Sequence, residues 1–159
     1  MTAPLGVRAA LIASLFLVLA ACGGDTSSAA SSPSASAQAP LVKTATATVA
    51  GASQTVLVGA NGMTLYYFLP DKGGKITCTG QCLVNWPPLI VPSTKTSVAA
   101  TSDITGKFTL LANTEANGSQ VVYNNWPMYF WIKDKAPGDT TGQGVGGKWF
   151  VATPGLVPG

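Results

Sequence analysis

The chain has 159 residues and a formal net charge of +3, and it contains no histidine. Without an imidazole, Ser-His-Asp and Cys-His catalysis are excluded, and so is histidine-bound zinc, copper or haem. The 9 basic residues are scattered and are opposed by 6 carboxylates, whereas a nucleic-acid surface needs clustered Lys and Arg. Composition therefore argues against a nucleic-acid partner, and we expect no enzymatic activity.

The N-terminal segment, residues 1–21, has the pattern of a secretory signal peptide. Arg8 is its only charge, and an apolar run from Ala9 to Ala21 follows, interrupted only by Ser14. This run is shorter than the ~20 residues that a membrane-spanning helix needs, but it suits the core of a signal peptide. We therefore predict that this segment exports the protein.

The end of the segment resembles the lipobox of bacterial lipoproteins, because Leu19, Ala20 and Ala21 stand directly before Cys22. The resemblance implies cleavage before Cys22 and a diacylglyceryl group on its sulfur. Two acyl chains give stable attachment, since each buried CH₂ contributes about 0.8 kcal/mol. We expect the anchor on the extracytoplasmic face of a bacterial membrane, and on the outer membrane of a two-membrane cell, because Gly23 stands where Asp would retain the protein. An ordinary secretory signal with an incidental cysteine is the alternative.

Residues 22–43 are rich in Ser, Ala and Thr, nearly uncharged and free of aromatic side chains. A segment of this composition buries too little apolar surface to offset the entropy of ordering it. We predict that it is a lipidated, flexible tether with a reach of roughly 25 Å.

Residues 44–159 are predicted to form an all-β domain. Short β-branched and aromatic runs alternate with Gly, Pro and Asn, and no window has a 3.6-residue apolar period. This pattern is typical of short strands joined by tight turns.

Two hairpins can be located within this domain. One runs from Thr55 to Phe68 with Asn61-Gly62 in its turn, and the other runs from Ser119 to Trp131 with Asn124-Asn125 in the same role. Pro127 cannot donate a hydrogen bond to a ladder, so it should begin a strand or lie at an edge.

An internal repeat relates the two hairpins. The octapeptide LYYFLPDK, residues 65–72, aligns with MYFWIKDK, residues 128–135. Farther on, TCTGQCLVNW aligns with DTTGQGVGGKW, which matches Thr79 to Thr141 and Trp86 to Trp149. We expect repeats at about residues 55–92 and 119–153, packed face to face as one small pseudo-symmetric sandwich or barrel.

These residues resemble the bacterial secreted-repeat lipoproteins, a family described by a Tyr-x-[Phe/Trp/Tyr]-x-x-Asp motif. Each repeat contains the motif once, and the sequences CTGQC and WPP accompany the first copy. The motif residues are Tyr66, Phe68 and Asp71 in the first repeat and Tyr129, Trp131 and Asp134 in the second. The resemblance covers residues 56–151 and implies an address outside the cytoplasm and a repeat architecture. It implies no reaction, because the function of that family is not established.

The motif residues are expected to be structural. On a strand, the tyrosine and the second aromatic residue point to the same face, and such pairs mostly belong to a core. An aspartate at a strand exit commonly accepts hydrogen bonds from the following turn. The alternative is a paired site across a pseudo-twofold axis, in which a ligand or cation is faced by Tyr66, Asp71, Tyr129 and Asp134. Met63 and Met128 are candidate soft ligands, although core packing explains both.

The remaining cysteines, Cys78 and Cys82, could form a disulfide, half of a metal site or a redox pair. An exported chain meets an oxidising compartment, and Cys22 is used by the lipid. The second repeat keeps Thr-Gly-Gln without sulfur, further metal ligands are not found, and the thioredoxin spacing is shorter by one residue. We predict a structural disulfide that contributes on the order of 2 kcal/mol.

Together, these features predict a lipid-anchored cell-envelope lipoprotein with a non-catalytic binding or interaction role. We expect no cofactor, and the partner is an unidentified envelope protein or small molecule. The alternative is an envelope redox or electron-transfer accessory that holds a metal or haem through Cys, Met or Tyr.

Overall fold

The computed structural model describes residues 38–159. The predicted signal peptide, the predicted lipid site Cys22 and most of the predicted tether lie outside the described residues. Within the described range the elements follow in the order β1 Val42–Val49, β2 Ala52–Gly59, β3 Tyr66–Phe68, the 3-10 helix η1 Leu69–Asp71, α1 Gln81–Asn85, β4 Ile90–Val91, β5 Phe108–Asn113, β6 Gly118–Tyr123, β7 Trp126–Pro127, the 3-10 helix η2 Val145–Gly147 and β8 Trp149–Val151. The all-β prediction is confirmed, since α1 is one short turn of helix.

Before each motif the chain forms an antiparallel hairpin that the sequence patterns did not reveal. β1 pairs with β2 along its whole length through a turn at Ala50 and Gly51, both with positive φ. β5 pairs with β6 in the same way. β1 starts at Val42, before the predicted boundary at residue 44, and its alternating Thr and Ala side chains explain why its hydrophobic pattern is weak.

The chain turns at Asn61-Gly62, as predicted for the hairpin from Thr55 to Phe68. The prediction that the two arms of this hairpin pair along their length is wrong. Gly62 has a φ of 80° and donates to the carbonyl of Gly59, but only one bridge, between Val58 and Thr64, continues the pairing. The reason is that β2 pairs mainly with β1, while β3 pairs elsewhere.

The second predicted hairpin is confirmed. β6 and β7 pair through Asn124 and Asn125, whose φ values of 47° and 64° place both residues in the left-handed region that tight hairpin turns require. Pro127 lies opposite Val122 in the two-residue strand β7, which joins the sheet outside its main strand order, β4-β6-β5. The proline therefore occupies a position where a missing donor is tolerated.

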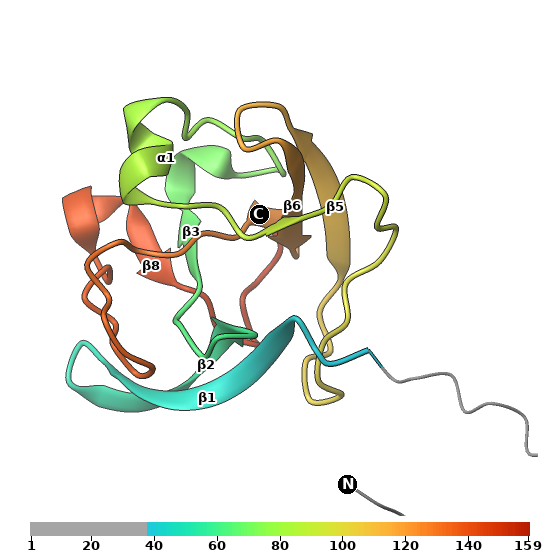
Figure 1. The fold of residues 1–159 in the computed structure, drawn as a ribbon. Helices are drawn as coiled ribbons and strands as arrows, with labels where there is room; N and C mark the ends of the chain where they lie inside the picture. Colours follow the sequence, from blue (N-terminus) through green and yellow to red (C-terminus); the bar gives the residue numbers. More distant parts are fainter. Residues whose placement is uncertain (1–37) are drawn as a thin grey trace, which may run out of the picture. The chain divides into compact units, whose positions relative to one another are not determined.

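The two repeats are interlocked rather than stacked as separate units. β3, from the first repeat, pairs antiparallel with β8, from the second, with Tyr66 opposite Val151 and Phe68 opposite Trp149. In the view of Figure 1, the β1–β2 hairpin lies at the bottom, β3 and β8 lie above it, and β5 and β6 lie to the right. The strands form several small antiparallel sheets, one of which joins the two repeats.

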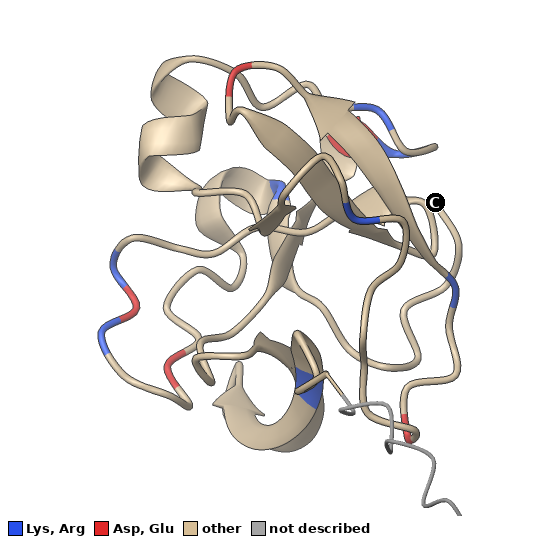
Figure 2. Ribbon diagram, turned by 45° about the vertical axis from the view of Figure 1, so that its right-hand side comes forward, with Lys and Arg blue, Asp and Glu red and all other residues tan. Residues whose placement is uncertain are grey.

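The core has two adjoining parts. One contains aliphatic side chains and Tyr123, Trp126 and Met128, and the other contains most of the large aromatic residues, including Tyr66, Trp86, Tyr129 and Trp149. The second part lies around β3 and β8, the two strands through which the repeats pair. Charged residues lie on separate loops and strands in Figure 2, and the lysines of the described region form no single basic face.

Candidate functional site

The two motif tyrosines meet at the centre of the molecule. The backbone amide of Tyr66 donates to the carbonyl of Tyr129 at 2.8 Å, and the amide of Tyr129 donates to the carbonyl of Tyr66 at 2.9 Å. Both side chains are fully buried. This reciprocal pair is the point about which the two repeats are related.

Each tyrosine hydroxyl binds the aspartate of the opposite repeat. Tyr66 Oη donates to Asp134 Oδ2, and Tyr129 Oη donates to Asp71 Oδ2, both at 2.6 Å. Both carboxylates are buried as well, Asp71 completely and Asp134 with 6% of its surface exposed. Each motif tyrosine therefore binds the aspartate of the other copy, and this pairing exists only when the two copies are combined.

The second oxygen of each aspartate holds the following loop. Asp71 Oδ1 accepts the amide and hydroxyl of Thr77 at 2.8 and 2.6 Å, and Asp134 Oδ1 accepts the same two groups of Thr141 at 3.0 and 2.6 Å. The structural counterpart of Thr141 is therefore Thr77, and the sequence alignment that matched Thr141 to Thr79 is wrong. The error arose because both repeats contain Thr-Gly-Gln. This tripeptide begins at Thr141 itself in the second repeat, but two residues after Thr77 in the first.

These threonines belong to the cluster, and sequence reasoning missed them. The signal that was present is a threonine six or seven residues after each motif aspartate. The hydrogen bonds in the structure show that this spacing matters. The expectation that the aspartates lock the following turns is confirmed.

The ligand-facing alternative does not match this geometry. All four carboxylate oxygens of the paired site accept hydrogen bonds from the protein itself. Met128 is fully buried in the aliphatic part of the core, and Met63 is half-buried near the turn after β2. In residues 38–159, no three His, Cys, Asp or Glu side chains gather closely enough to hold a metal ion.

Burial and charge keep both phenols protonated. Removal from water raises the pKa of Tyr66, and the hydrogen bond and negative charge of Asp134 raise it further. The pKa of Tyr129 is raised in the same way, by burial first and by Asp71 second. Each phenol therefore remains a neutral donor to a carboxylate throughout the ordinary pH range.

Four aromatic rings form a continuous stack beside the tyrosines. Ring centroids are 4.2 Å apart between Phe68 and Trp149, 3.8 Å between Trp149 and Trp86, and 4.0 Å between Trp86 and Trp131. The central rings, Trp86 and Trp149, are nearly parallel and well buried. Trp86 thus belongs to the core, as the sequence favoured, and does not form an exposed docking patch.

The stack is locked onto the tyrosines by edge contacts. Tyr66 meets Trp86 edge to face at 5.4 Å, and Tyr129 meets Trp149 in the same way at 5.2 Å. Gly142 closes the cluster, because its amide donates to Tyr66 Oη at 3.2 Å and a Cβ there would lie 2.7 Å from the Tyr66 ring. The family motif therefore builds an aromatic and carboxylate cluster of pseudo-twofold symmetry.

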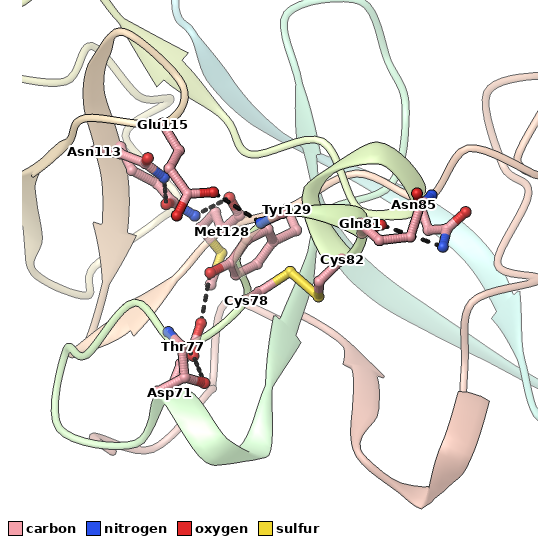
Figure 3. Close-up of a disulfide and its surroundings, with 12 residues drawn as sticks. Asp71, Thr77, Cys78, Gln81, Cys82, Asn85, Asn113, Glu115, Met128 and Tyr129 are labelled. Carbon is pink, nitrogen blue, oxygen red and sulfur yellow. Dashed lines mark hydrogen bonds between the residues drawn. A yellow bond between two sulfur atoms is a disulfide. The ribbon is translucent and has the colours of Figure 1, made fainter.

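The predicted disulfide is present between Cys78 and Cys82, with Cα atoms 5.3 Å apart. It closes the loop that enters α1, and Figure 3 shows it near the Tyr129–Asp71–Thr77 chain of hydrogen bonds. Cys78 directly follows Thr77 in the chain. The bridge therefore stabilises the loop that supplies the donors to Asp71.

A contact from another hairpin supports the same loop. Glu115, between β5 and β6, accepts the amide of Gly80 at 2.8 Å. The second repeat has Gly142 where the structural alignment places Cys78, so no bridge can form there. The disulfide is an asymmetric addition to a symmetric cluster.

Fold and cluster together define a two-repeat, all-β domain whose copies exchange Tyr–Asp hydrogen bonds. The chain belongs to the Lipoprotein_15 family, a secreted repeat of unknown function, whose model matches residues 47–90 and 112–153 and so covers more than half of the chain. The predicted resemblance is confirmed, with one match for each repeat. Both matches begin before the predicted repeats, near the end of β1 and the end of β5.

Membership in a secreted family indicates a location outside the cytoplasm. Comparison with curated proteins and with solved structures yields no match. No helix in the described part of the chain has the length and apolar character required to cross a membrane.

Proposed function

We propose that this protein is a lipid-anchored domain of the bacterial cell envelope with a non-catalytic role in binding a partner protein. The secreted family and the lipobox before Cys22 support the anchor and its address. The buried cluster supports the non-catalytic role, because the tyrosines and aspartates that the motif marks are engaged with one another and are inaccessible to a substrate.

The observation that carries the binding role is an apolar hollow where the described chain enters the domain. It has a volume of about 240 Å³ and is lined largely by aliphatic residues, among them Leu41, Ile90, Val91 and Ala99. Ligand pockets for small molecules usually have ~300–1,000 Å³. The hollow is therefore better suited to one or two apolar side chains of a partner protein than to a whole metabolite.

The edge of the hollow is polar. Lys95 Nζ donates to Gln38 Oε1 at 3.1 Å, and both residues line the opening. An apolar centre with a polar rim is the common anatomy of protein interfaces. The dispersed lysines favour this kind of partner over a nucleic acid.

Photocrosslinking tests the interaction. The photoreactive residue p-benzoylphenylalanine is placed at Ala60, which is exposed at the hollow, or at Ala136, which is also exposed but does not line it. In native envelopes we expect a discrete crosslinked species from position 60 and none from position 136. Equal crosslinking from both positions, or none from position 60, would contradict the proposed surface.

Lipid labelling tests the anchor. Cells fed with radioactive palmitate should label the unaltered chain, and Cys22→Ser should lose the label and be released from the membrane fraction. Cys78→Ser is the matched control, because it removes another sulfur without touching the lipobox. Label that persists in the Cys22→Ser variant would refute the anchor.

The metal- or haem-binding redox accessory is less well supported. It would need Cys, Met or Tyr ligands, but Cys78 and Cys82 are joined. Met128 and both motif tyrosines are fully buried, which leaves the half-buried Met63 as the most accessible of the candidates named above. The purified protein should therefore be colourless and contain no stoichiometric metal, as measured by visible absorption and elemental analysis.

A further inference from the structure

We propose that the aromatic stack carries single oxidising equivalents from Trp131 to the buried tyrosine–aspartate pairs, so that the domain acts as a reversible electron relay without a cofactor. This activity is independent of the binding role proposed above. It rests on three features: continuous ring contact, one oxidisable ring at the surface end, and a proton acceptor at each buried end.

Ring contact provides the path. The centroid separations along Trp131, Trp86 and Trp149 are 4.0 and 3.8 Å, so neighbouring indole π-systems touch. Electron transfer between rings in contact is fast because no saturated bonds or water separate them. An electron hole, which is the charge left on an indole that has lost one electron, can therefore move to the next ring.

The asymmetry between the repeats sets the entry point. Both outer rings are half-buried, but one is Trp131 and the other is Phe68, and an indole loses an electron far more easily than a phenyl ring. Lys133 Nζ lies 5.6 Å from the Trp131 ring centroid. Its positive charge destabilises an oxidised Trp131 and favours transfer of the hole inward to Trp86.

The indole proton has no local acceptor at the entry ring. Trp131 Nε1 is buried and has no hydrogen-bond partner among the described residues. An oxidised indole that cannot release its proton stays a radical cation, which is a stronger oxidant than the neutral radical. The hole therefore passes to Trp86 and is not trapped on Trp131.

The tyrosines are the end points because each has a base in contact. Tyr66 meets Trp86, Tyr129 meets Trp149, and each phenol donates to a buried carboxylate oxygen at 2.6 Å. A phenol that loses an electron becomes a strong acid, so its proton passes to that oxygen. Burial, which raises the pKa of both tyrosines, keeps the proton on the phenol until then.

The step balances in electrons and protons. A diffusible one-electron oxidant of the extracytoplasmic space, such as a nitrogen dioxide or carbonate radical, takes one electron from Trp131. One electron then moves outward from Tyr129 through Trp149 and Trp86 to Trp131, while the phenolic proton moves to Asp71 Oδ2. The products are the reduced oxidant, a phenoxyl radical and a neutral carboxylic acid. A one-electron donor such as a thiolate reverses the sequence, and the proton returns to the phenol.

Pulse radiolysis of the full chain in detergent, with the azide radical as oxidant, tests the relay. Transient absorption should show an indole radical that decays as a phenoxyl radical rises, and electron spin resonance should identify the phenoxyl product. Tyr66→Phe/Tyr129→Phe should abolish this rise. Tyr67→Phe should leave it intact, because Tyr67 packs on Trp126 and Phe150 outside the stack.

The aspartates provide the readout that a purely structural cluster would not change. Asp71→Asn/Asp134→Asn retains the side-chain size but removes the base, so the indole radical should persist without a phenoxyl signal in protein whose near-ultraviolet circular dichroism is unaltered. If that variant does not fold, the unaltered chain in D₂O replaces it, and conversion should be slower than in H₂O. An unchanged phenoxyl yield without the buried tyrosines, or conversion at the same rate in D₂O, would overturn the relay.

Discussion

At the scale of single residues, the motif acts across the repeats. Tyr66 and Tyr129 each donate to a carboxylate that belongs to the other copy, and each carboxylate also holds a threonine of its own loop. A buried carboxylate is stable only when donors surround it. The motif residues therefore form one network, in which the loss of a single donor leaves a buried charge partly unpaired.

Tyr66→Phe should lower the free energy of unfolding by about 1–3 kcal/mol, because Asp134 Oδ2 would remain buried without its donor. Urea denaturation followed by tryptophan fluorescence measures the change. Tyr67→Phe is the control, since Tyr67 is half-buried and its ring packing is retained, and its effect should be within about 0.5 kcal/mol. Equal stability of the Tyr66→Phe variant and the unaltered chain would contradict the network.

Stability should fall at alkaline pH because of the same two residues. Their pKa values are raised by folding, so the folded state binds more protons than the unfolded state above about pH 10, the ordinary pKa of tyrosine. The stabilisation is complete below that pH and is lost as pH rises beyond it, by up to about 1.4 kcal/mol per pH unit for each tyrosine.

Urea denaturation at a series of pH values from neutral to alkaline measures this loss. Tyr66→Phe/Tyr129→Phe should have a flatter dependence than the unaltered chain, with the contribution of Tyr67, whose pKa burial also raises, common to both. Parallel profiles would show that these phenols do not titrate differently in the two states.

At the scale of elements, turns with strong signals were predictable, whereas the pairing of the strands beside them and the strands with weak patterns were not. Asn124-Asn125 located the β6–β7 turn because adjacent asparagines tolerate positive φ. β1 was not predicted because its alternating Thr and Ala side chains differ little in hydrophobicity. Its pairing with β2 depends on both strands and cannot be read from either one alone. The disulfide was predictable from export and from cysteine count.

The Cys78–Cys82 bridge should stabilise the loop before α1. For so short a loop, the entropy of the unfolded chain accounts for about 2 kcal/mol. Cys78→Ala/Cys82→Ala should therefore fold with a free energy of unfolding lower by about this amount, measured by urea denaturation. Thiol titration of the unaltered, unfolded chain should find both cysteines unreactive until a reductant is added, and two reactive thiols beforehand would refute the bridge.

At the scale of the whole molecule, the repeats depend on one another. β3 of the first repeat pairs with β8 of the second, and the Tyr–Asp bonds cross between them in both directions. Each repeat alone would expose an unpaired strand edge and leave one carboxylate without its phenol. The family repeat is therefore half of a folding unit.

Separate fragments covering residues 38–92 and 93–159 should each lack a cooperative thermal transition. Mixed at equal concentration, they should regain one if the interlocked contacts provide most of the folding free energy. Circular dichroism and heteronuclear NMR measure both states. An independently folded fragment would contradict the interdependence of the repeats.

The sequence by itself determined the class of fold, the two-repeat organisation, the motif residues and the disulfide pair, because turn chemistry, alternation and local similarity are all recorded in neighbouring residues. Tertiary structure alone decided that β3 joins β8, that Thr77 corresponds to Thr141, and that each motif tyrosine binds the opposite aspartate. Thr77 and Thr141 are identified by bonds to the aspartate of their own repeat, whereas the β3–β8 pairing and the Tyr–Asp bonds join residues far apart in the chain. No local pattern encodes such contacts, because they exist only when burial brings the two repeats around one shared core.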